Sequence, residues 1–559
     1  MKLVVLLGLF HLAGALKYDA CQSPLQLLDA TLDELREGLD GGCFTSVDLV
    51  KAYMSRINDV NDVLHAVNEI NPDALDEAKR LDKDRKRMAS SKPLYGIPIL
   101  IKDNIATFDQ MNNTAGSLAL VGARVPEDSG VVSRLRKAGA IILGKTNLSE
   151  WANFRSSNST NGWSAYGGQA VGAYFQQQDP SGSSSGSAIA ASIGLAWATL
   201  GTETSGSIVS PAERNNVVGI KPTVGLTSRY LVVPISQRRD TVGPIARTVK
   251  DAASLLAVVA GRDERDNYTD AIPPGALPDY VAACTDNGLQ GRRIGVPRAL
   301  DGRLREPVRE AFNKALDILR GAGAEVIQDI DMPGLTDESD PSVNVLGADM
   351  KADLPTKYLS KLTTNPQNIT SLADLRAFTQ REPREEFPFR DTAAWDSSLS
   401  PGAAEAGSAL YWAALNAEID SSGPRGITGA LANQSLDALV GTPDLLSGLA
   451  SSLGTPLITV PLGRFPDDSP FKPSPVGPLN RSGPNRPFGL AFAGDRFGEE
   501  ALIGMACAFE ARGGGRDMVK PVVKPETDLG DVLGRKEEEQ VECNELNPEE
   551  CIKVEATKD

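Results

Sequence analysis

Residues 179–208 read DPSGSSSGSAIAASIGLAWATLGTETSGSI, which places two loops of small residues on either side of an apolar run. The first loop (179–187) is rich in Gly and Ser, and the apolar run starts directly after it at Ala188. The second loop is GTETSGSI (201–208). Taken alone, a Gly/Ser run is more often a flexible linker than a site. Because a helical run follows it at once, we interpret this one as the entrance to a helix.

The alternation of strand-like and helical segments extends to both sides of this stretch. Between Tyr95 and Gly261, short apolar runs such as IPILI, AIILG and VVGIKP alternate with Gly/Ser-rich loops and helical segments. Residues 292–330 repeat the pattern, and further strand-like runs occupy 457–463 and 487–494. Strands that alternate with helices are typical of α/β architecture. The sequence therefore predicts an α/β fold.

The composition narrows the possible functions of the chain. Of its 559 residues, 41% are hydrophobic and 23% charged, which is ordinary for a globular protein. The net charge of −16 disfavours nucleic acid and acidic membranes as partners, because both are anionic. Histidine occurs only at His11 and His65. A Ser-His-Asp triad or a zinc site with several histidines is nearly excluded by this count.

The N-terminus has the pattern of a secretory signal. Lys2 precedes an apolar run (3–10), and Ala-Gly-Ala at 13–15 forms a cleavage site of the A-x-A type. We expect a signal peptide over residues 1–15, cleavage after Ala15, and a secreted protein. The alternative is a buried first helix. No later stretch has about 18 uninterrupted apolar residues, so we expect no membrane span.

The even number of cysteines, six, is compatible with disulfides in an exported protein, and their spacing matches no zinc site. Cys507 lies in an apolar helical run and is interpreted as a buried thiol rather than half of a bridge. Cys543 and Cys551 could pair with each other. The remaining cysteines are Cys21, Cys43 and Cys284.

Glycosylation signals are numerous. Asn-x-Ser/Thr sequons occur at Asn112, Asn147, Asn158, Asn267, Asn368, Asn433 and Asn480. In an exported protein they mark possible glycans on surface loops. Asn147 follows an apolar strand-like run and should be packed, whereas Asn267, Asn433 and Asn480 lie in polar, turn-rich surroundings. We expect a glycoprotein.

Gly139-Ala-Ile-Ile-Leu-Gly144-Lys145-Thr146 satisfies the phosphate-loop pattern GxxxxGK[ST]. A phosphate-binding loop should follow a strand and turn sharply. Here the four residues between the glycines favour a buried strand that itself follows a helix. We therefore interpret the match as accidental and expect no nucleotide site.

Lys102 is the candidate for a catalytic base. This lysine ends the apolar run Pro-Ile-Leu-Ile (98–101), and burial would lower its pKa toward the value that a base requires. The alternative is that its side chain reaches the surface. The small residues of 201–208 let backbone N–H groups approach a ligand closely, as an oxyanion hole requires. A serine nucleophile needs a base, and without histidine Lys102 is the plausible one.

These segments together resemble the amidase signature family, whose members hydrolyse amides with a Ser–cis-Ser–Lys triad. The resemblance runs from about Gly96 to Gly261 and resumes at 453–463 and 487–511. It implies a single large α/β domain with a central mixed sheet surrounded by helices. We assign it residues 16–515, followed by an acidic, disordered tail over 516–559.

The resemblance also implies the roles of individual residues. GIPILIKDN matches the lysine strand of the family, so Lys102 is the base. GSSSGS and GTETSGSI match its two serine segments, which makes Ser183 the cis-serine and Ser207 the nucleophile, 24 residues apart. The residues expected to bind the substrate and hold the oxyanion are Thr204, Ser205, Gly206 and Ser207. The family uses no metal and no organic cofactor.

Within the family, FRSSNSTNGWSAYGGQ (154–169) is most similar to the bacterial peptide amidases, although Ser205 stands where relatives carry Gly or Asp. We predict a secreted amidase that converts a carboxamide to an acid and ammonia or an amine through a serine acyl-enzyme. Its partner is a small-molecule amide, with amidated amino acids or short peptides as candidates. Two alternatives are an amide-forming acyltransferase and a non-catalytic secreted binding protein. The oligomeric state is open.

Overall fold

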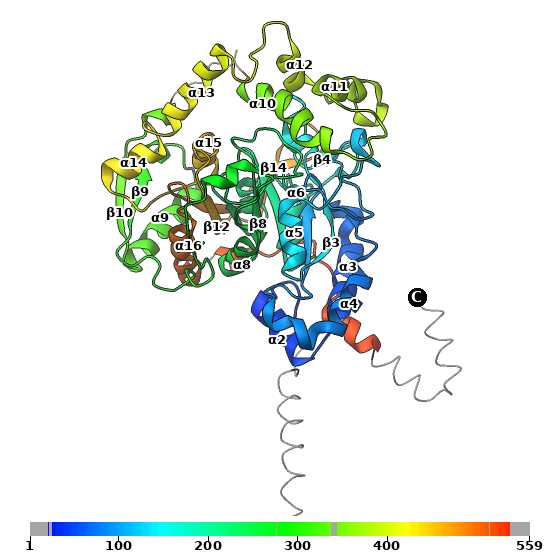
Figure 1. Ribbon diagram of the computed structural model, residues 1–559. Helices are drawn as coiled ribbons and strands as arrows, with labels where there is room; N and C mark the ends of the chain where they lie inside the picture. The colour runs from blue at the N-terminus through cyan, green and yellow to red at the C-terminus, as the bar shows by residue number, and fades with distance from the viewer. Residues whose placement is uncertain (1–20, 22–24, 276, 337–343, 514, 537–559) are drawn as a thin grey trace, which may run out of the picture.

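The computed structural model describes residues 21, 25–275, 277–336, 344–513 and 515–536 (Figure 1). Its centre is an eleven-stranded sheet with the strand order β1-β3-β2-β6-β8-β7-β12-β15-β11-β9-β10. The strands are β1 (Val67–Ile70), β2 (Pro98–Lys102), β3 (Ile141–Thr146), β6 (Ala198–Glu203), β7 (Val218–Lys221), β8 (Thr241–Ala246), β9 (Arg293–Pro297), β10 (Glu325–Ile330), β11 (Ala438–Gly441), β12 (Leu457–Arg464) and β15 (Pro487–Ala493). Two small hairpins add β4 (Trp163–Ser164) with β5 (Gly168–Gln169), and β13 (Lys472–Pro473) with β14 (Asn480–Ser482).

The sheet is mixed. Strand β2 lies parallel between β3 and β6, and β9 lies parallel between β10 and β11. Within the run β6-β8-β7-β12-β15-β11 each strand pairs antiparallel with the next, and β1 pairs antiparallel with β3. The predicted α/β fold with a central mixed sheet is therefore confirmed.

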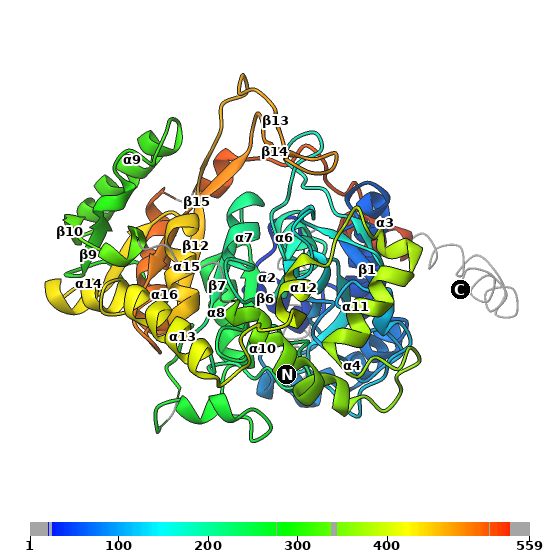
Figure 2. The ribbon, with the colours of Figure 1, turned by 90° about the horizontal axis from the view of Figure 1, so that it is seen from above.

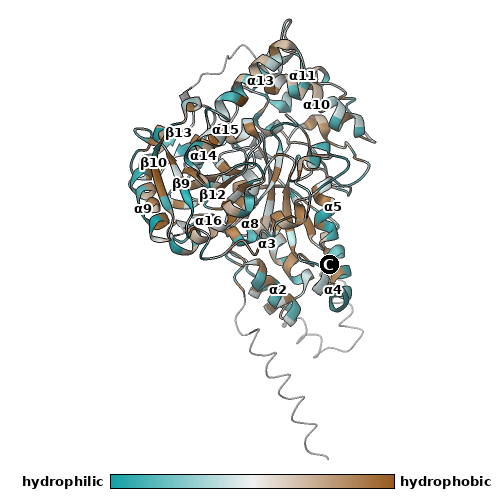
Figure 3. Ribbon diagram, turned by 60° about the vertical axis from the view of Figure 1, so that its left-hand side comes forward, coloured by the Kyte–Doolittle hydropathy of each residue, from teal (hydrophilic) through white to brown (hydrophobic). Residues whose placement is uncertain are grey.

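Helices surround the sheet on both faces (Figures 1 and 2). They are α2 (Leu32–Gly41), α3 (Ser46–Leu64), α4 (Ala74–Met88), α5 (Gly130–Lys137), α6 (Ser185–Ser192), α7 (Val209–Arg214), α8 (Val249–Val259), α9 (Val308–Gly321), α10 (Val345–Asp353), α11 (Leu372–Arg381), α12 (Ala393–Leu399), α13 (Ala409–Ser422), α14 (Ile427–Gln434), α15 (Pro443–Leu453) and α16 (Glu499–Gly513). Hydropathy follows this layering, with the hydrophobic residues concentrated on the inner strands (Figure 3).

Helix α6 is the internal helix of the molecule, because all eight of its residues are buried. Its small side chains allow this close packing. A Cβ added at Gly186 would lie 2.2 Å from the Ala66 carbonyl oxygen and 2.6 Å from the Asn147 amide nitrogen. The helix therefore starts at a fixed place beside β2 and β6, and the loop before it is held with the same precision.

Helices α10, α11 and α12 form a separate layer over the sheet, together with α13 (Figure 1). Apolar side chains of α10, α11 and α12 build a second buried cluster with residues of the sheet domain, whereas α13 packs against α10 in a smaller one. At the centre of the second cluster, Trp395 of α12 meets Trp151 edge-on, with 5.9 Å between the ring centroids. The segment from α10 to α13, residues 345–422, is thus a helical cap.

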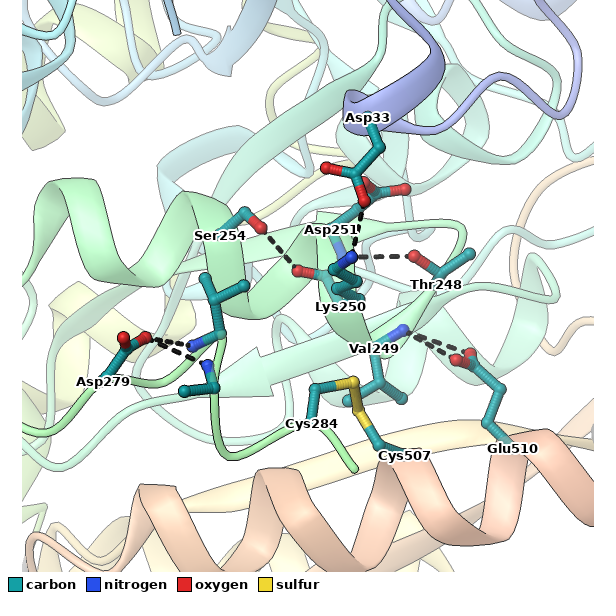
Figure 4. Close-up of a disulfide and its surroundings, with 12 residues drawn as sticks. Asp33, Thr248, Val249, Lys250, Asp251, Ser254, Asp279, Cys284, Cys507 and Glu510 are labelled. Atoms are coloured by element: carbon teal, nitrogen blue, oxygen red, sulfur yellow. Dashed lines mark hydrogen bonds and ion pairs between the residues drawn. A yellow bond between two sulfur atoms is a disulfide. The ribbon is translucent and has the colours of Figure 1, made fainter. Parts of the chain in front are cut away.

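Two disulfides join distant segments in the described part of the chain, Cys21–Cys43 and Cys284–Cys507. The second ties the segment before β9 to helix α16 (Figure 4). The interpretation of Cys507 as a buried thiol is therefore wrong, because the apolar helix buries a bridge instead. Cys543 and Cys551 lie outside the described residues.

Residues after 515, which we expected to form a disordered tail, pack against the domain as far as the described part of the chain extends. Leu529 is fully buried, and the Asp528 carboxylate accepts a hydrogen bond from the Leu27 amide at 2.8 Å. The Lys536 ammonium forms an ion pair with the Asp48 carboxylate at the start of α3. The packed domain thus extends beyond residue 515, because apolar residues such as Leu529 interrupt the acidic sequence. Residues 537–559 lie outside the described part.

Within the described ranges, no helix is both long enough and apolar enough to cross a membrane. His65 is exposed and ends helix α3, where its backbone has a left-handed φ of 46°. It therefore lies at a helix end, away from the buried interior in which Lys102 sits.

Candidate active site

Lys102 is the last residue of β2 and is fully buried. Its Nζ lies 2.7 Å from the Ser183 hydroxyl and 3.0 Å from the Ser184 hydroxyl. The hydroxyl and the carbonyl oxygen of Thr202 are 2.9 and 3.2 Å away. Burial lowers the pKa of Lys102 to about 7, although the carboxylates of Glu203 and Asp240 partly oppose this shift.

Ser183 follows a cis peptide bond after Gly182, in the Gly/Ser-rich loop before α6. Gly182 has no room for a side chain, because a Cβ there would lie 2.3 Å from the Ser149 hydroxyl oxygen. The Ser149 amide donates to the Ser183 carbonyl at 3.0 Å. The loop is thus fixed on one side by Ser149 and on the other by the Lys102 hydrogen bond.

Ser207 lies between β6 and α7 and is buried, with 6% of its surface exposed. The Ser184 amide donates to the Ser207 carbonyl at 3.1 Å, so the two serine loops run side by side. The structure therefore brings Lys102, Ser183 and the Ser207 segment together at the C-terminal ends of β2 and β6.

The turn that carries Ser207 is held by Glu203, whose role the sequence analysis missed. The Glu203 carboxylate accepts the amide hydrogens of Gly206 (2.9 Å), Ile208 (2.7 Å) and Val209 (3.1 Å). The Gly206 amide is therefore not available to an oxyanion in this conformation. An acid just ahead of a turn whose amides point back to it is the signal that could have identified this contact.

The other predicted binding residues flank this turn. The Thr204 hydroxyl donates to the Asp240 carboxylate at 2.6 Å, and that carboxylate also accepts the amides of Ile235 and Ser236. Burial raises the pKa of Asp240 to about 6. Ser205 is exposed beside the buried Thr204 and Ser207.

A Glu203→Gln variant should lose part of the hydrogen bonding that holds the Ser207 turn. The amide of glutamine offers one acceptor oxygen where the carboxylate offers two, so at least one of the three backbone amides loses its partner. We expect turnover to fall about tenfold to a hundredfold and the free energy of unfolding to fall by ~1–3 kcal/mol. Thermal melting and steady-state rates measure both effects, with the exposed Glu264→Gln as control. Full activity in Glu203→Gln would contradict the assigned role.

The buried strand expected within the phosphate-loop match is present. Residues 141–146 form strand β3, and Lys145 is fully buried. Its Nζ donates to the Ile105 carbonyl at 2.5 Å and to the Asn113 side-chain oxygen at 2.7 Å. These partners hold the ammonium inside the protein, where it cannot reach a phosphate.

A buried ionic network joins the helical cap to the segment that includes Glu150 and Arg155. Arg155 pairs with Glu385 at 2.9 Å and also with Glu150. Arg390 lies over the ring of Trp163, with its guanidinium carbon 4.0 Å from the ring centroid. Glu385 and Arg390 of the cap segment thus contact Arg155 and Trp163.

No group of three or more His, Cys, Asp or Glu side chains in the described residues is placed to hold a metal ion. The described site offers instead a buried amine, several hydroxyls and backbone amides. Such groups suit proton transfer and nucleophilic attack on a carbonyl carbon.

A mixed α/β sheet with a buried lysine bonded to a serine that follows a cis peptide is the arrangement expected of the amidase class. The chain belongs to this family, since the family model described as Amidase matches residues 48–417. It is therefore a hydrolase of carbon–nitrogen amide bonds, and its family acts on small amide substrates.

Individual relatives agree over nearly the whole chain. A protein of Arthroderma benhamiae, provisionally named as an amidase, is 48% identical over 540 residues, or 92% of this chain and 90% of its own length. The X-ray structure of native peptide amidase from Stenotrophomonas maltophilia is 38% identical with a TM-score of 0.78, and the match covers 89% of this chain and 99% of that one. An amidase family protein from Bacillus anthracis has the same TM-score at 31% identity, with 89% and 93% covered.

Proposed function

We propose that this protein hydrolyses amides through an acyl-enzyme on Ser207, with Ser183 as proton relay and Lys102 as base. The observation that carries the proposal is the buried Lys102 Nζ, 2.7 Å from the Ser183 hydroxyl. The hydrogen bond from the Ser184 amide to the Ser207 carbonyl supports it, because it aligns the two serine loops.

The proposed reaction starts with neutral Lys102. The lysine accepts the Ser183 proton while Ser183 accepts the proton of the Ser207 hydroxyl, and the Ser207 oxygen attacks the amide carbonyl carbon. Backbone amides of the 204–207 turn stabilise the oxyanion, with the exception of the Gly206 amide, which Glu203 occupies. The relay then returns a proton to the leaving nitrogen, and water cleaves the acyl-enzyme.

The activity should depend on pH through Lys102. Its pKa is lowered to about 7, so the amine is charged and inactive below that pH and neutral and active above it. We expect the hydrolysis rate to rise with pH along a single limb centred near 7, far below the ~10.4 of a free lysine. A profile of kcat/KM between pH 5 and 9 measures the limb. A limb centred near 10 would contradict the role of Lys102.

As substrates we propose primary amides of small, soluble acyl groups, including amidated amino acids and short peptides. The 38% identity to a peptide amidase over 99% of that chain supports this class. Internal peptide bonds should survive, because a buried lysine-based site leaves little room for chain beyond the scissile carbon. Long-chain fatty amides should be poor substrates.

A side-by-side assay tests the proposed function. Purified protein is given an amidated dipeptide, a long-chain fatty amide and an unblocked oligopeptide, with Ser207→Ala as the blank. We expect ammonia from the amidated dipeptide alone. Ammonia from the fatty amide alone would overturn the substrate class, and release of amino acids from the oligopeptide would overturn the restriction to terminal amides. With hydroxylamine added, the ratio of hydroxamate to free acid measures how far acyl transfer competes with hydrolysis.

We further propose that the protein is secreted. The expected signal peptide over residues 1–15 lies outside the described residues, but the two disulfides are typical of an oxidising compartment. N-terminal sequencing of protein from the culture medium should begin at Leu16. A sequence that begins at Met1 would contradict cleavage.

Among the sequons, exposure favours some over others as glycan sites. Asn267, Asn368 and Asn433 are exposed, whereas Asn480 is half-buried and its side-chain amide donates to the Gln176 carbonyl. Asn147 is buried and its amide donates to the His65 carbonyl at 2.9 Å, in agreement with the expectation that it is packed. We propose glycans at these three exposed sites.

A further inference from the structure

Asn104 lies two residues beyond Lys102 and is 97% buried, with 3% of its surface exposed. Its Nδ2 is 3.0 Å from the Thr202 hydroxyl, while its Oδ1 is buried without a hydrogen-bond partner. The Thr202 hydroxyl also lies 2.9 Å from the Lys102 Nζ. The unpartnered Oδ1 therefore belongs to a side chain that is linked to Lys102, the proposed base, through the Thr202 hydroxyl.

The hydrogen atoms around Lys102 can be counted. A neutral lysine amine has two N–H donors and one lone pair, and as a base it must direct the lone pair at the Ser183 hydroxyl. The Ser184 hydroxyl donates to the Thr202 carbonyl at 3.1 Å, so it can only accept from Lys102. That takes one N–H, and the Thr202 hydroxyl or carbonyl oxygen takes the other.

The orientation of the Asn104 amide decides how the Thr202 hydroxyl behaves. If Nδ2 faces Thr202, the hydroxyl oxygen accepts from Asn104 and its hydrogen is free to donate into the Lys102 lone pair. It would then compete with Ser183 for that lone pair. If Oδ1 faces Thr202, the hydroxyl donates to Asn104 and its oxygen accepts an N–H of Lys102. The two amide atoms are distinguished only by their hydrogen bonds, and the second orientation leaves Oδ1 with a partner.

We infer that Asn104 is a positioning residue: its Oδ1 accepts the Thr202 hydroxyl hydrogen and thereby leaves the Lys102 lone pair free for Ser183. The inference rests on the proposed function of Lys102 as base. In this arrangement Nδ2 points away from Thr202. Asn104 also lines, with Thr202, Thr204 and Asp240, a cavity of about 10 Å³, which is room for one water molecule to accept from Nδ2.

A double-mutant cycle tests this inference. Asn104→Leu removes the acceptor at similar volume, and we expect kcat to fall about tenfold to a hundredfold with KM unchanged within threefold. Thr202→Val removes the competing hydroxyl. Because Asn104 acts through that hydroxyl, Asn104→Leu should cost less than twofold further in the Thr202→Val background. An equal loss in both backgrounds would overturn the inference, because it indicates a general structural role.

A charged variant gives a second readout. Asn104→Asp keeps an acceptor facing Thr202, so the rate at high pH should stay within about threefold of the parent. Its carboxylate adds to those of Glu203 and Asp240 near Lys102, so the acid limb of the pH profile should move to higher pH. An unmoved limb together with a rate as low as that of Asn104→Leu would count against the inference.

A serine-directed probe separates this inference from the proposed function. Phenylmethanesulfonyl fluoride forms an oxygen–sulfur bond to Ser207 and releases fluoride, while the Ser207 proton passes by way of Ser183 to Lys102. Its labelling rate reports base activation without any amide substrate and should follow the same cycle. Labelling that follows the cycle in a protein that cleaves no amide supports the inference and contradicts the proposed function. Labelling that ignores Asn104 overturns the inference while amide hydrolysis stands.

Stability requires its own control. Asn71 is also buried, and its side chain donates to the Ile142 carbonyl at 2.7 Å, away from the lysine. We expect Asn71→Leu to lower the melting temperature. At an assay temperature well below melting, it should not slow turnover or labelling. If Asn71→Leu slows labelling as much as Asn104→Leu does, loss of packing explains both and the inference is overturned.

Discussion

Ser207→Ala removes the proposed nucleophile, and we expect amide hydrolysis to fall by at least about 10⁴-fold. The substitution deletes one oxygen from a buried site whose turn is held by backbone contacts to Glu203 and Ser184, so the fold should remain. Ammonia release under saturating substrate measures the loss, and circular dichroism verifies the fold.

A matched serine elsewhere controls for the substitution itself. The Ser254 hydroxyl donates to the Lys250 carbonyl within helix α8, far along the chain from the site. Ser254→Ala should hydrolyse amides at the parent rate. Residual hydrolysis by Ser207→Ala within tenfold of the parent would show that another group attacks the carbonyl.

The second large effect concerns the base. Lys102→Met keeps most of the side-chain volume but removes the amine that accepts the Ser183 proton. We expect kcat to fall about 10³-fold to 10⁴-fold, and the residual rate should lose the limb near pH 7. Steady-state rates from pH 5 to 9 measure both changes.

Lys221 provides the control for replacing a buried lysine. It is also fully buried, its Nζ donates to the Thr455 carbonyl at 2.7 Å, and burial lowers its pKa to about 8. Lys221→Met should lower the melting temperature but keep turnover within about threefold. If both methionine variants lose activity equally, the loss in Lys102→Met reflects packing rather than base catalysis.

Sequence patterns predicted the parts of the site that lie in short segments. The apolar run before Lys102 and the small residues around Ser183 and Ser207 each extend over fewer than ten positions, and the structure brings these segments together. The α/β fold followed from the same local alternation. Such features are readable because strand periodicity and loop composition are local properties.

Contacts between segments that are distant along the chain could not be predicted from the sequence. The bridge between Cys284 and Cys507 spans 223 positions, and the helix around Cys507 reads as apolar whether or not a bridge forms. Likewise, nothing in the sequence around Glu385 indicates that it pairs with Arg155, 230 positions away. Asn104 and Glu203 lay within the quoted motifs, but their hydrogen bonds depend on side-chain geometry rather than on residue type.

The most direct test of the account is to locate the acyl group during turnover. Protein that is hydrolysing an amidated dipeptide is quenched in acid, digested and mapped by mass spectrometry. We expect an acyl adduct on Ser207 that is absent from Ser207→Ala and forms about 10³-fold more slowly in Lys102→Met. An adduct on another residue, or one that forms equally fast in Lys102→Met, would contradict it.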